Sequence, residues 1–448
     1  MKYLKSAICI LLVCLMLTGC SFRMASSIDD LISPVSPFGD NADIQKAMDS
    51  YAKNGYSLKV PVAGKYNTSY NFYDIDGDGN KDLVVGSLEY GDGNDEAFAF
   101  YEPADKLGSI DMAVIKKIDG IWSVVDNVTG DGKEIYSVDF HDLTGDGKKD
   151  ILICWDVIKN STNHQLTVYS YSSGKSSFKL KQIGIEMTIN NYTTVDFNGD
   201  KIDELLLMFI GTGHSNSATA ELYSLKGANI KSLGYTKLDS HITSYTKLSV
   251  GKVDNDIRVY ADAIGSDGKS MLTEVLYWSD SYKSVISPFY SYSTGRTSGT
   301  SRSAMISSMD INNDGVIEIP TDTSVSKLPK QVMAVDWQTY KHTTLIHTDY
   351  SLFVPNDGYS VIIPDKYKNK IAVSYDEKTR KMTVTNNSTK KTVFSVVTVM
   401  KAVYDKNNFK GYSSVLDTSG YYYLAQSGND SDIKITVGDI KNYIKAAE

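Results

Sequence analysis

Four short segments of the chain place oxygen-bearing side chains at alternate positions, a spacing that can bind a metal ion. The first segment spans residues 74–82 and reads Asp-Ile-Asp-Gly-Asp-Gly-Asn-Lys-Asp, and the others begin at Asp142, Asp196 and Asp310. Side-chain oxygens at positions one, three and five, a main-chain carbonyl at seven and a carboxylate at nine can converge on one hard cation. Glycine at position four or six permits the tight turn. Calcium, with six to eight oxygen ligands, fits this set best, so we predict calcium as the cofactor.

The predicted ligands occupy the same five positions of each segment, with position seven contributing its carbonyl. They are Asp74, Asp76, Asp78, Asn80 and Asp82; Asp142, Thr144, Asp146, Lys148 and Asp150; Asp196, Asn198, Asp200, Ile202 and Glu204; and Asp310, Asn312, Asp314, Val316 and Glu318. The alternative of acidic β-turns that bind nothing stays open, more so where Thr144 weakens position three and Lys201 replaces glycine. EF-hand loops are excluded, because position twelve never holds glutamate and apolar strands follow instead of helices.

The four segments are copies of a longer repeat. Their starts, together with a degenerate copy at Ser249 in which Gly251 and Val253 also replace acids, lie 53 to 68 residues apart. Such a period is typical of a supersecondary unit that buries its apolar faces against its neighbours. Each interval has room for about four short strands, as in residues 193–197, 204–210, 219–224 and 230–237, which is the layout of a propeller blade. We expect the degenerate copy to bind no ion.

The loops and the apolar runs after them, such as residues 83–86, 151–153 and 205–207, resemble FG-GAP or VCBS repeats, the calcium-loop blades of integrin-α-type propellers. The resemblance covers about residues 60–345 and implies a β-propeller of about five to seven four-stranded blades. The whole chain also resembles lipoproteins of Gram-positive anaerobes. The expected fold class is therefore mainly β, with the propeller followed by a small α+β domain.

The N-terminal twenty residues are typical of an export signal. Lys2 and Lys5 precede a short apolar run that ends in Leu-Thr-Gly-Cys at residues 17–20, a sequence that resembles the bacterial lipobox. The resemblance implies that residues 1–19 are removed and that Cys20 carries the lipid, which would anchor the protein to the outer face of the cell membrane. An ordinary secretory signal with an incidental cysteine is the alternative. Residues 20–59 would then be a lipidated tether with one short helix over residues 43–52.

The pattern changes near residue 349. Residues 359–363, 371–375, 381–385 and 393–400 predict antiparallel strands, and Thr436 with Asp439 predicts the start of a terminal helix. Residues 349–448 are therefore expected to form the α+β domain, in which we find no catalytic motif. Because Cys9 and Cys14 would leave with the signal and Cys20 would be acylated, Cys154 would carry the one free thiol. A disulfide framework is therefore excluded, and since Cys154 lies in an apolar strand, a buried, inert thiol is expected.

The predicted function is that of a surface binding or scaffold protein for a protein or glycan ligand. The alternative is a hydrolase or lyase that uses the propeller face, but the six histidines show no zinc spacing and no nucleophile motif occurs, so we expect no enzyme. A net charge of −8 with few arginines argues against a nucleic-acid partner. The Ser-, Thr- and Gly-rich segment 291–303, with Arg296 and Arg302, is predicted to be a recognition loop or, preferably, a flexible one.

Overall fold

The computed structural model describes residues 40–75, 96–130, 132–158, 162–174, 177–211, 217–254, 256–323, 328–341 and 343–447. These residues form mainly β structure, which confirms the predicted class. Cys20 and the predicted ligands Asp76, Asp78, Asn80 and Asp82 lie outside the described residues. Among the residues in those ranges, no helix is long and apolar enough to cross a membrane.

Four antiparallel sheets follow one another along the chain, each built from consecutive strands. The first holds β1 (Tyr56–Lys59), β2 (Asn71–Phe72), β3 (Glu96–Pro103), β4 (Asp111–Ile118) and β5 (Ile121–Thr129), and the second holds β6 (Glu134–His141), β7 (Asp150–Asp156), β8 (His164–Gly174) and β9 (Ser177–Ile189). The third holds β10 (Asn191–Val195), β11 (Glu204–Phe209), β12 (Thr219–Ser224) and β13 (Lys231–Lys237), and the fourth holds β14 (Ile242–Val253), β15 (Asp256–Gly265), β16 (Met271–Ser279) and β17 (Ser284–Ile286). The strands of the third sheet confirm those predicted for one repeat.

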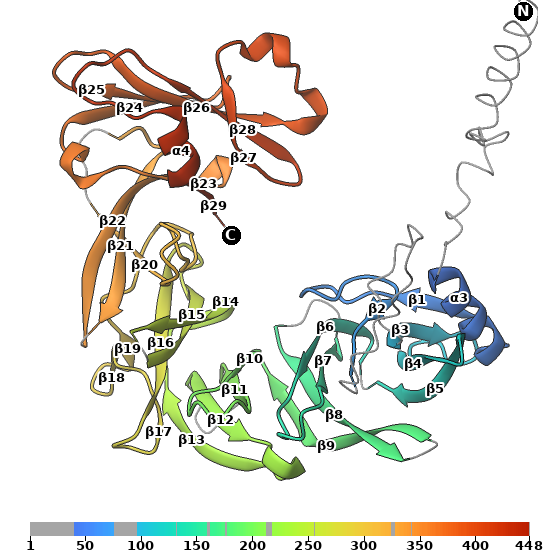
Figure 1. Ribbon diagram of the computed structural model, residues 1–448. Helices are drawn as coiled ribbons and strands as arrows, with labels where there is room; N and C mark the ends of the chain where they lie inside the picture. The colour runs from blue at the N-terminus through green and yellow to red at the C-terminus, as the bar shows by residue number, and fades with distance from the viewer. Residues whose placement is uncertain are drawn as a thin grey trace, which may run out of the picture.

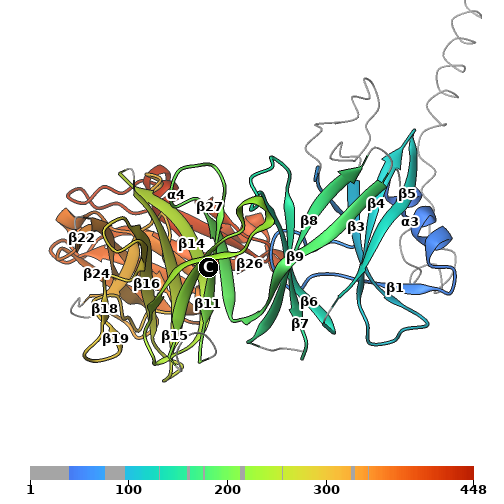
Figure 2. The same cartoon turned by 90° about the horizontal axis from the view of Figure 1, so that it is seen from below.

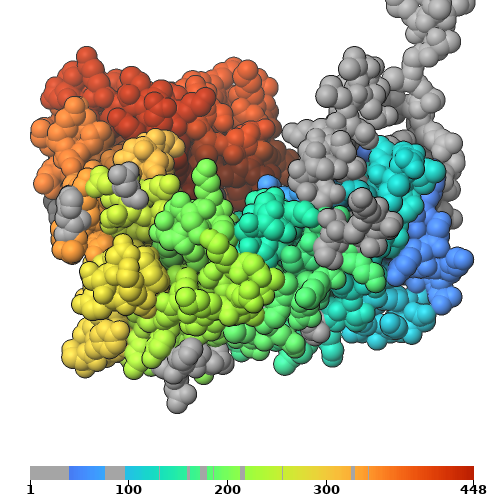
Figure 3. Space-filling model, turned by 60° about the horizontal axis from the view of Figure 1, so that its bottom comes forward, coloured from blue at the N-terminus to red at the C-terminus, as the bar shows by residue number. Residues whose placement is uncertain are grey.

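Neighbouring sheets stand side by side along an arc (Figures 1 and 2). The inner strands of the second and third sheets are buried on both faces, because each of these sheets packs between two others; every residue of β7 and β11 is buried. Leu152 and Cys154 of the second sheet pack with Leu205 and Leu207 of the third in one apolar cluster. Burial raises the pKa of the Cys154 thiol, in agreement with an inert cysteine. The space-filling view shows the sheets as one continuous body (Figure 3).

A fifth sheet crosses the predicted domain boundary. It holds β20 (Ile319–Asp322), β21 (Met333–Lys341), β22 (Thr344–Val354), β23 (Tyr359–Ile362) and β29 (Ile444–Ala446), in that order. Because β22 runs without a break through residues 345–349, a boundary there would cut a strand. β29 comes from the C-terminal end of the described chain and pairs with β23, with Tyr359 opposite Ala446. The fifth sheet thus combines residues from both sides of the predicted boundary.

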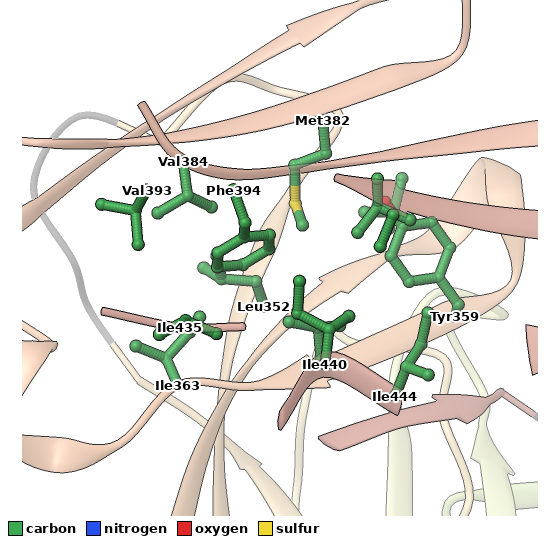
Figure 4. Packing of buried hydrophobic residues seen from close by; sticks show 14 of the residues in the cluster. Leu352, Tyr359, Ile363, Met382, Val384, Val393, Phe394, Ile435, Ile440 and Ile444 are labelled. Atoms are coloured by element: carbon green, nitrogen blue, oxygen red, sulfur yellow. The ribbon is translucent and has the colours of Figure 1, made fainter. Parts of the chain in front are cut away.

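The sixth sheet lies against one face of the fifth. It runs in the order β24 (Ile371–Asp376), β25 (Lys381–Asn386), β26 (Thr392–Met400), β28 (Tyr421–Ser427) and β27 (Ser413–Asp417), which confirms three predicted strands. Figure 4 shows Met382 and Phe394 of this sheet facing Leu352 and Ile440, and these side chains belong to one buried cluster. Ile440 belongs to α4 (Val437–Tyr443), which confirms the predicted terminal helix, and Thr436 and Asp439 form a capping box at its start.

The remaining helices are short. α3 (Asp40–Tyr51) buries Ile44, Ala47 and Met48 against the first sheet, whereas Tyr51, which continues the same helical spacing, is 48% exposed. Single 3-10 turns occur at η1 (Lys226–Ala228), η2 (Pro355–Asp357), η3 (Asp365–Tyr367), η4 (Lys401–Val403) and η5 (Lys406–Phe409).

Two predictions about loops were wrong. Residues 249–253 form no degenerate loop but the end of β14, where Ser249 pairs with Tyr260. The segment 291–303 is not simply flexible: it contributes to the small hairpin β18 (Tyr290–Ser291) and β19 (Arg296–Thr297), and the Arg302 side chain is fully buried. Its guanidinium donates to Asp262 Oδ1 over 2.8 Å, so Arg302 belongs to the core of the fourth sheet.

Candidate calcium loops

The three described loops share one backbone geometry. In each of them the aspartate at position one accepts hydrogen bonds from main-chain amides later in the loop, such as Gly147 N to Asp142 Oδ2 at 2.9 Å and Gly315 N to Asp310 Oδ2 at 2.9 Å. The aspartate at position five likewise accepts from the amide at position seven, for example Val316 N to Asp314 Oδ1 at 2.8 Å. These bonds fold the loop back on itself.

The carboxylate at position nine has a second role that the sequence did not suggest. Asp150, Glu204 and Glu318 each accept a hydrogen bond from the amide at position two, with distances of 2.9, 3.0 and 3.1 Å. Each stands at or just before the start of an apolar strand, so the bond ties the loop to the sheet. In the first loop, Ile75 N donates in the same way to Glu96 Oε2 at 2.7 Å. Glu96 is buried and opens β3, and an acid at the start of an apolar strand is the signal that could have identified it.

The first three loops adjoin one another along one edge of the sheets. Lys149 N in the second loop donates to Ile75 O in the first, and Asp203 N in the third donates to Asp142 O in the second. Gly145 of the second loop has a φ of +76°, and a Cβ there would lie 2.5 Å from Ile202 Cδ1 of the third. This close approach explains why glycine is needed at that position, since a side chain would separate the two loops.

The fourth loop leaves one carboxylate oxygen without a partner. Glu318 is fully buried, and although its Oε2 accepts from Ile311 N, its Oε1 has no hydrogen-bond partner. Burial raises the pKa of Glu318 to about 8. The hydrogen bond from Ile311 N acts in the opposite direction, and the nearby carboxylates of Asp314, Asp310 and Asp349 raise the pKa further. A bound cation would relieve this repulsion, because an unpaired buried charge is costly. The side chains of this loop, three carboxylates and the Asn312 amide, supply oxygens of the kind that calcium prefers.

In the third loop, two carboxylates already interact with other side chains of the protein. Lys226 Nζ lies 3.1 Å from Asp200 Oδ2, and Asn198 Nδ2 donates to Glu204 Oε1 at 2.7 Å. Burial nevertheless raises the pKa of Glu204 to about 7. Since Lys226 places a positive charge on the carboxylate at position five, this loop fits calcium less well than the fourth.

The second loop is intermediate between the third and the fourth, because it combines an oxygen that has no hydrogen-bond partner with a carboxylate that is already bonded within the protein. Thr144 at position three is buried, and its Oγ1 has no hydrogen-bond partner, so this oxygen is available to a ligand. Asp150 Oδ2, however, accepts from both Leu143 N and Thr144 N. Burial raises the pKa of Asp150. Across the described residues, no three His, Cys, Asp or Glu side chains lie close enough together to hold a metal ion in this arrangement.

The described histidines form structural contacts. His141 Nδ1 lies 2.9 Å from Asp203 Oδ2 and thereby links the second sheet to the third loop. His164 is buried, lies 2.5 Å from Asp156 and stacks on Tyr136 with ring centroids 3.8 Å apart. His241 lies beside a serine: its Nδ1 is 3.1 Å from Ser240 Oγ and 3.2 Å from Asp239 Oδ1. The hydroxyl and the carboxylate thus meet the same ring nitrogen, whereas a catalytic triad uses both nitrogens, so this contact gives no support to the hydrolase alternative.

Comparison with known proteins leaves the family open. No family model matches the chain, and no curated protein matches it. Among solved structures, it is similar to a hypothetical selenium-binding protein from Sulfolobus tokodaii, with 13% identity and a TM-score of 0.28, over 43% of this chain and 51% of that one. The match thus spans about half the length of that protein, and a likeness of this size carries no argument about function.

Proposed function

We propose that the chain is a lipid-anchored, calcium-binding β-propeller that acts on the outer face of a bacterial membrane as a binding or scaffold protein for a protein or glycan ligand. The blades would be the successive antiparallel sheets, and the C-terminal α+β unit would follow them. Calcium would hold the adjoining loops rigid along one edge of the sheets. A repetitive framework of antiparallel sheets suits a binding or scaffold protein.

The observation that carries this proposal is the unpartnered Oε1 of Glu318. It lies in a loop whose other acids, Asp310 and Asp314, already use oxygens to fix the backbone. The four predicted loops contain more carboxylates than the eight negative charges by which acids outnumber bases in the whole chain. The negative charge of the protein is therefore concentrated in these loops. Bringing like charges so close together costs free energy unless a cation is present.

We expect Glu318→Gln to remove one calcium site, because it takes a carboxylate out of the loop that fits the ion best. Titration calorimetry on chelator-treated protein should show one site fewer than the unaltered chain. The matched control is Glu204→Gln, the same change at the same position of the loop in which Lys226 already supplies a positive charge. That control should alter the calcium stoichiometry less. If Glu318→Gln binds as many ions as the unaltered protein, the fourth loop is not a calcium site.

The membrane anchor has a separate test. Cys20→Ala should abolish labelling by a fatty-acid probe and release the protein from the membrane fraction, since one thiol carries the predicted lipid. Cys154→Ala is the control and should be labelled normally, because that thiol is buried. Continued acylation of Cys20→Ala would place the anchor elsewhere.

A further inference from the structure

A groove of about 600 Å³ lies on the sixth sheet, at a distance from the acidic loops along the chain. One wall is the turn between β24 and β25, and the other is the excursion between β26 and β27 that contains η4 and η5. Its volume falls in the range of sites that bind small molecules or a few units of a polymer.

The floor of the groove is apolar and aromatic. Val397 and Val399 of β26 pack with Phe409 and Tyr412 of the excursion in one cluster on this face of the sheet. At the rim, Val403 is 65% exposed, although it is apolar. Exposed apolar side chains beside a concave surface are typical of a binding site.

Basic side chains border this floor. Lys378, Arg380 and Lys381 line the groove against one acid, Asp376, whose Oδ1 accepts from Lys378 N. Residues 376–412 contain eight Lys and Arg against three Asp and Glu, in a chain whose net charge is −8. Arg380 is held by Asp357, with Nε 2.7 Å from Oδ1, so its charge is already paired.

The ammonium groups of Lys378 and Lys381 are available to pair with a ligand. Lys381 Nζ lies 5.7 Å from the centre of the Tyr412 ring, and within the described ranges neither Lys378 nor Lys381 forms an ion pair with a carboxylate. A ligand that carries negative charge beside an apolar surface would therefore complement both the rim and the floor.

The position of the groove argues against an extended peptide. β25 and β26 beneath it are each paired on both sides, so their main-chain groups are already used. Peptides that bind sheets by strand addition need an unpaired edge. Sugar rings, by contrast, bind through apolar C–H faces that pack on aromatic side chains, and uronic acids add carboxylates. Single-stranded nucleic acid is disfavoured because the one arginine of the groove is already paired.

We propose that this groove binds an acidic polysaccharide, with sugar rings on Phe409 and Tyr412 and carboxylates at Lys378 and Lys381. The inference stands on the sixth sheet alone and does not depend on calcium binding. It adds a second, basic recognition surface to a chain whose loops are acidic.

The test uses the full-length chain in detergent and a hyaluronan hexasaccharide, in which uronic acids alternate with neutral sugars. The unaltered protein should bind it, and the neutral chitin hexasaccharide should bind at least about tenfold more weakly. Lys378→Gln with Lys381→Gln should weaken binding by about tenfold, the size expected for two partly exposed ion pairs. The matched control is Lys390→Gln with Lys391→Gln, two exposed lysines at the turn between β25 and β26.

Three results would overturn the proposal. Absence of hyaluronan binding would do so directly, and equal losses in the two double variants would show that only overall charge matters. Tighter binding of polyglutamate or oligothymidylate, lost in the groove variant, would assign the groove to a different class of ligand. Melting temperatures measured for all variants separate loss of binding from loss of folding. Because the variants lie outside the acidic loops, the outcome is independent of the calcium titrations.

Discussion

Replacing Arg302 by methionine should lower the free energy of unfolding by about 3–5 kcal/mol, as expected when one member of a buried ion pair is removed. Arg302 and Asp262 are both fully buried, with Nη2 2.8 Å from Oδ1. Without the guanidinium, the Asp262 carboxylate would be a buried charge held by Thr273 Oγ1 at 2.6 Å and Ser308 N at 2.8 Å. The measurement is urea unfolding followed by intrinsic fluorescence.

Two further variants make this result interpretable. Arg296→Met lies in the same segment but is exposed, so its stability should change by less than about 0.5 kcal/mol. Replacing both partners, as in Arg302→Met with Asp262→Leu, should recover much of the loss, because no unpaired charge then remains in the core. A change of less than about 1 kcal/mol in Arg302→Met would show that the pair contributes little to stability.

Adding calcium to chelator-treated protein should raise its melting temperature by about 5–10 °C for each occupied loop. A ligand that binds the folded state alone stabilises it by about 2.7 kcal/mol at a hundredfold excess over its dissociation constant. A unit of 150–250 residues gains roughly 2–4 °C per kcal/mol, which gives the expected shift. Differential scanning calorimetry with and without calcium measures it, and magnesium at equal concentration is the control for ionic strength.

The third loop should contribute least to this shift. Lys226→Met would remove the positive charge from Asp200 and so increase the calcium-dependent rise in melting temperature, while lowering stability in chelator. A melting temperature that calcium does not change would contradict the proposed sites in all the loops. The prediction concerns a structural ion, because extracellular sites work with dissociation constants of about 0.1–1 mM and stay occupied.

Strands were predictable where alternation and turn residues coincide. Residues 219–224 form β12 as expected, since Ala220 and Leu222 alternate with more polar residues and the run is bounded by the Lys-Gly-Ala turn at residues 226–228. The burial of Arg302 was not predictable in this way. A segment rich in serine, threonine and glycine has no apolar period, and the partner Asp262 lies forty residues earlier in the chain. Long-range pairing of this kind is invisible to any local pattern.

The sequence predicts which residues make up the candidate loops, but it does not predict how the loops differ from one another. The spacing indicates five ligand positions in each loop, yet Lys226 reaches Asp200 from the turn after β12, and nothing near residue 200 points to it. The change in sequence pattern near residue 349 marks the approach to the sixth sheet and not the end of the fifth, since β22 continues through it. Local sequence patterns therefore predict the strands but do not predict which sheet each strand joins.

The pairing of β23 with β29 has a consequence for folding kinetics. The two strands are neighbours in the fifth sheet, yet residues 363–443, including the whole sixth sheet, separate them along the chain. Contacts of such high sequence separation form late, because the chain between them must first become compact. The sixth sheet is thus expected to collapse first and bring β29 to its edge, so that the fifth sheet is completed in a slow final step. Until then the edge of β23 is unpaired, and this is the stage at which two copies of the chain could exchange strands.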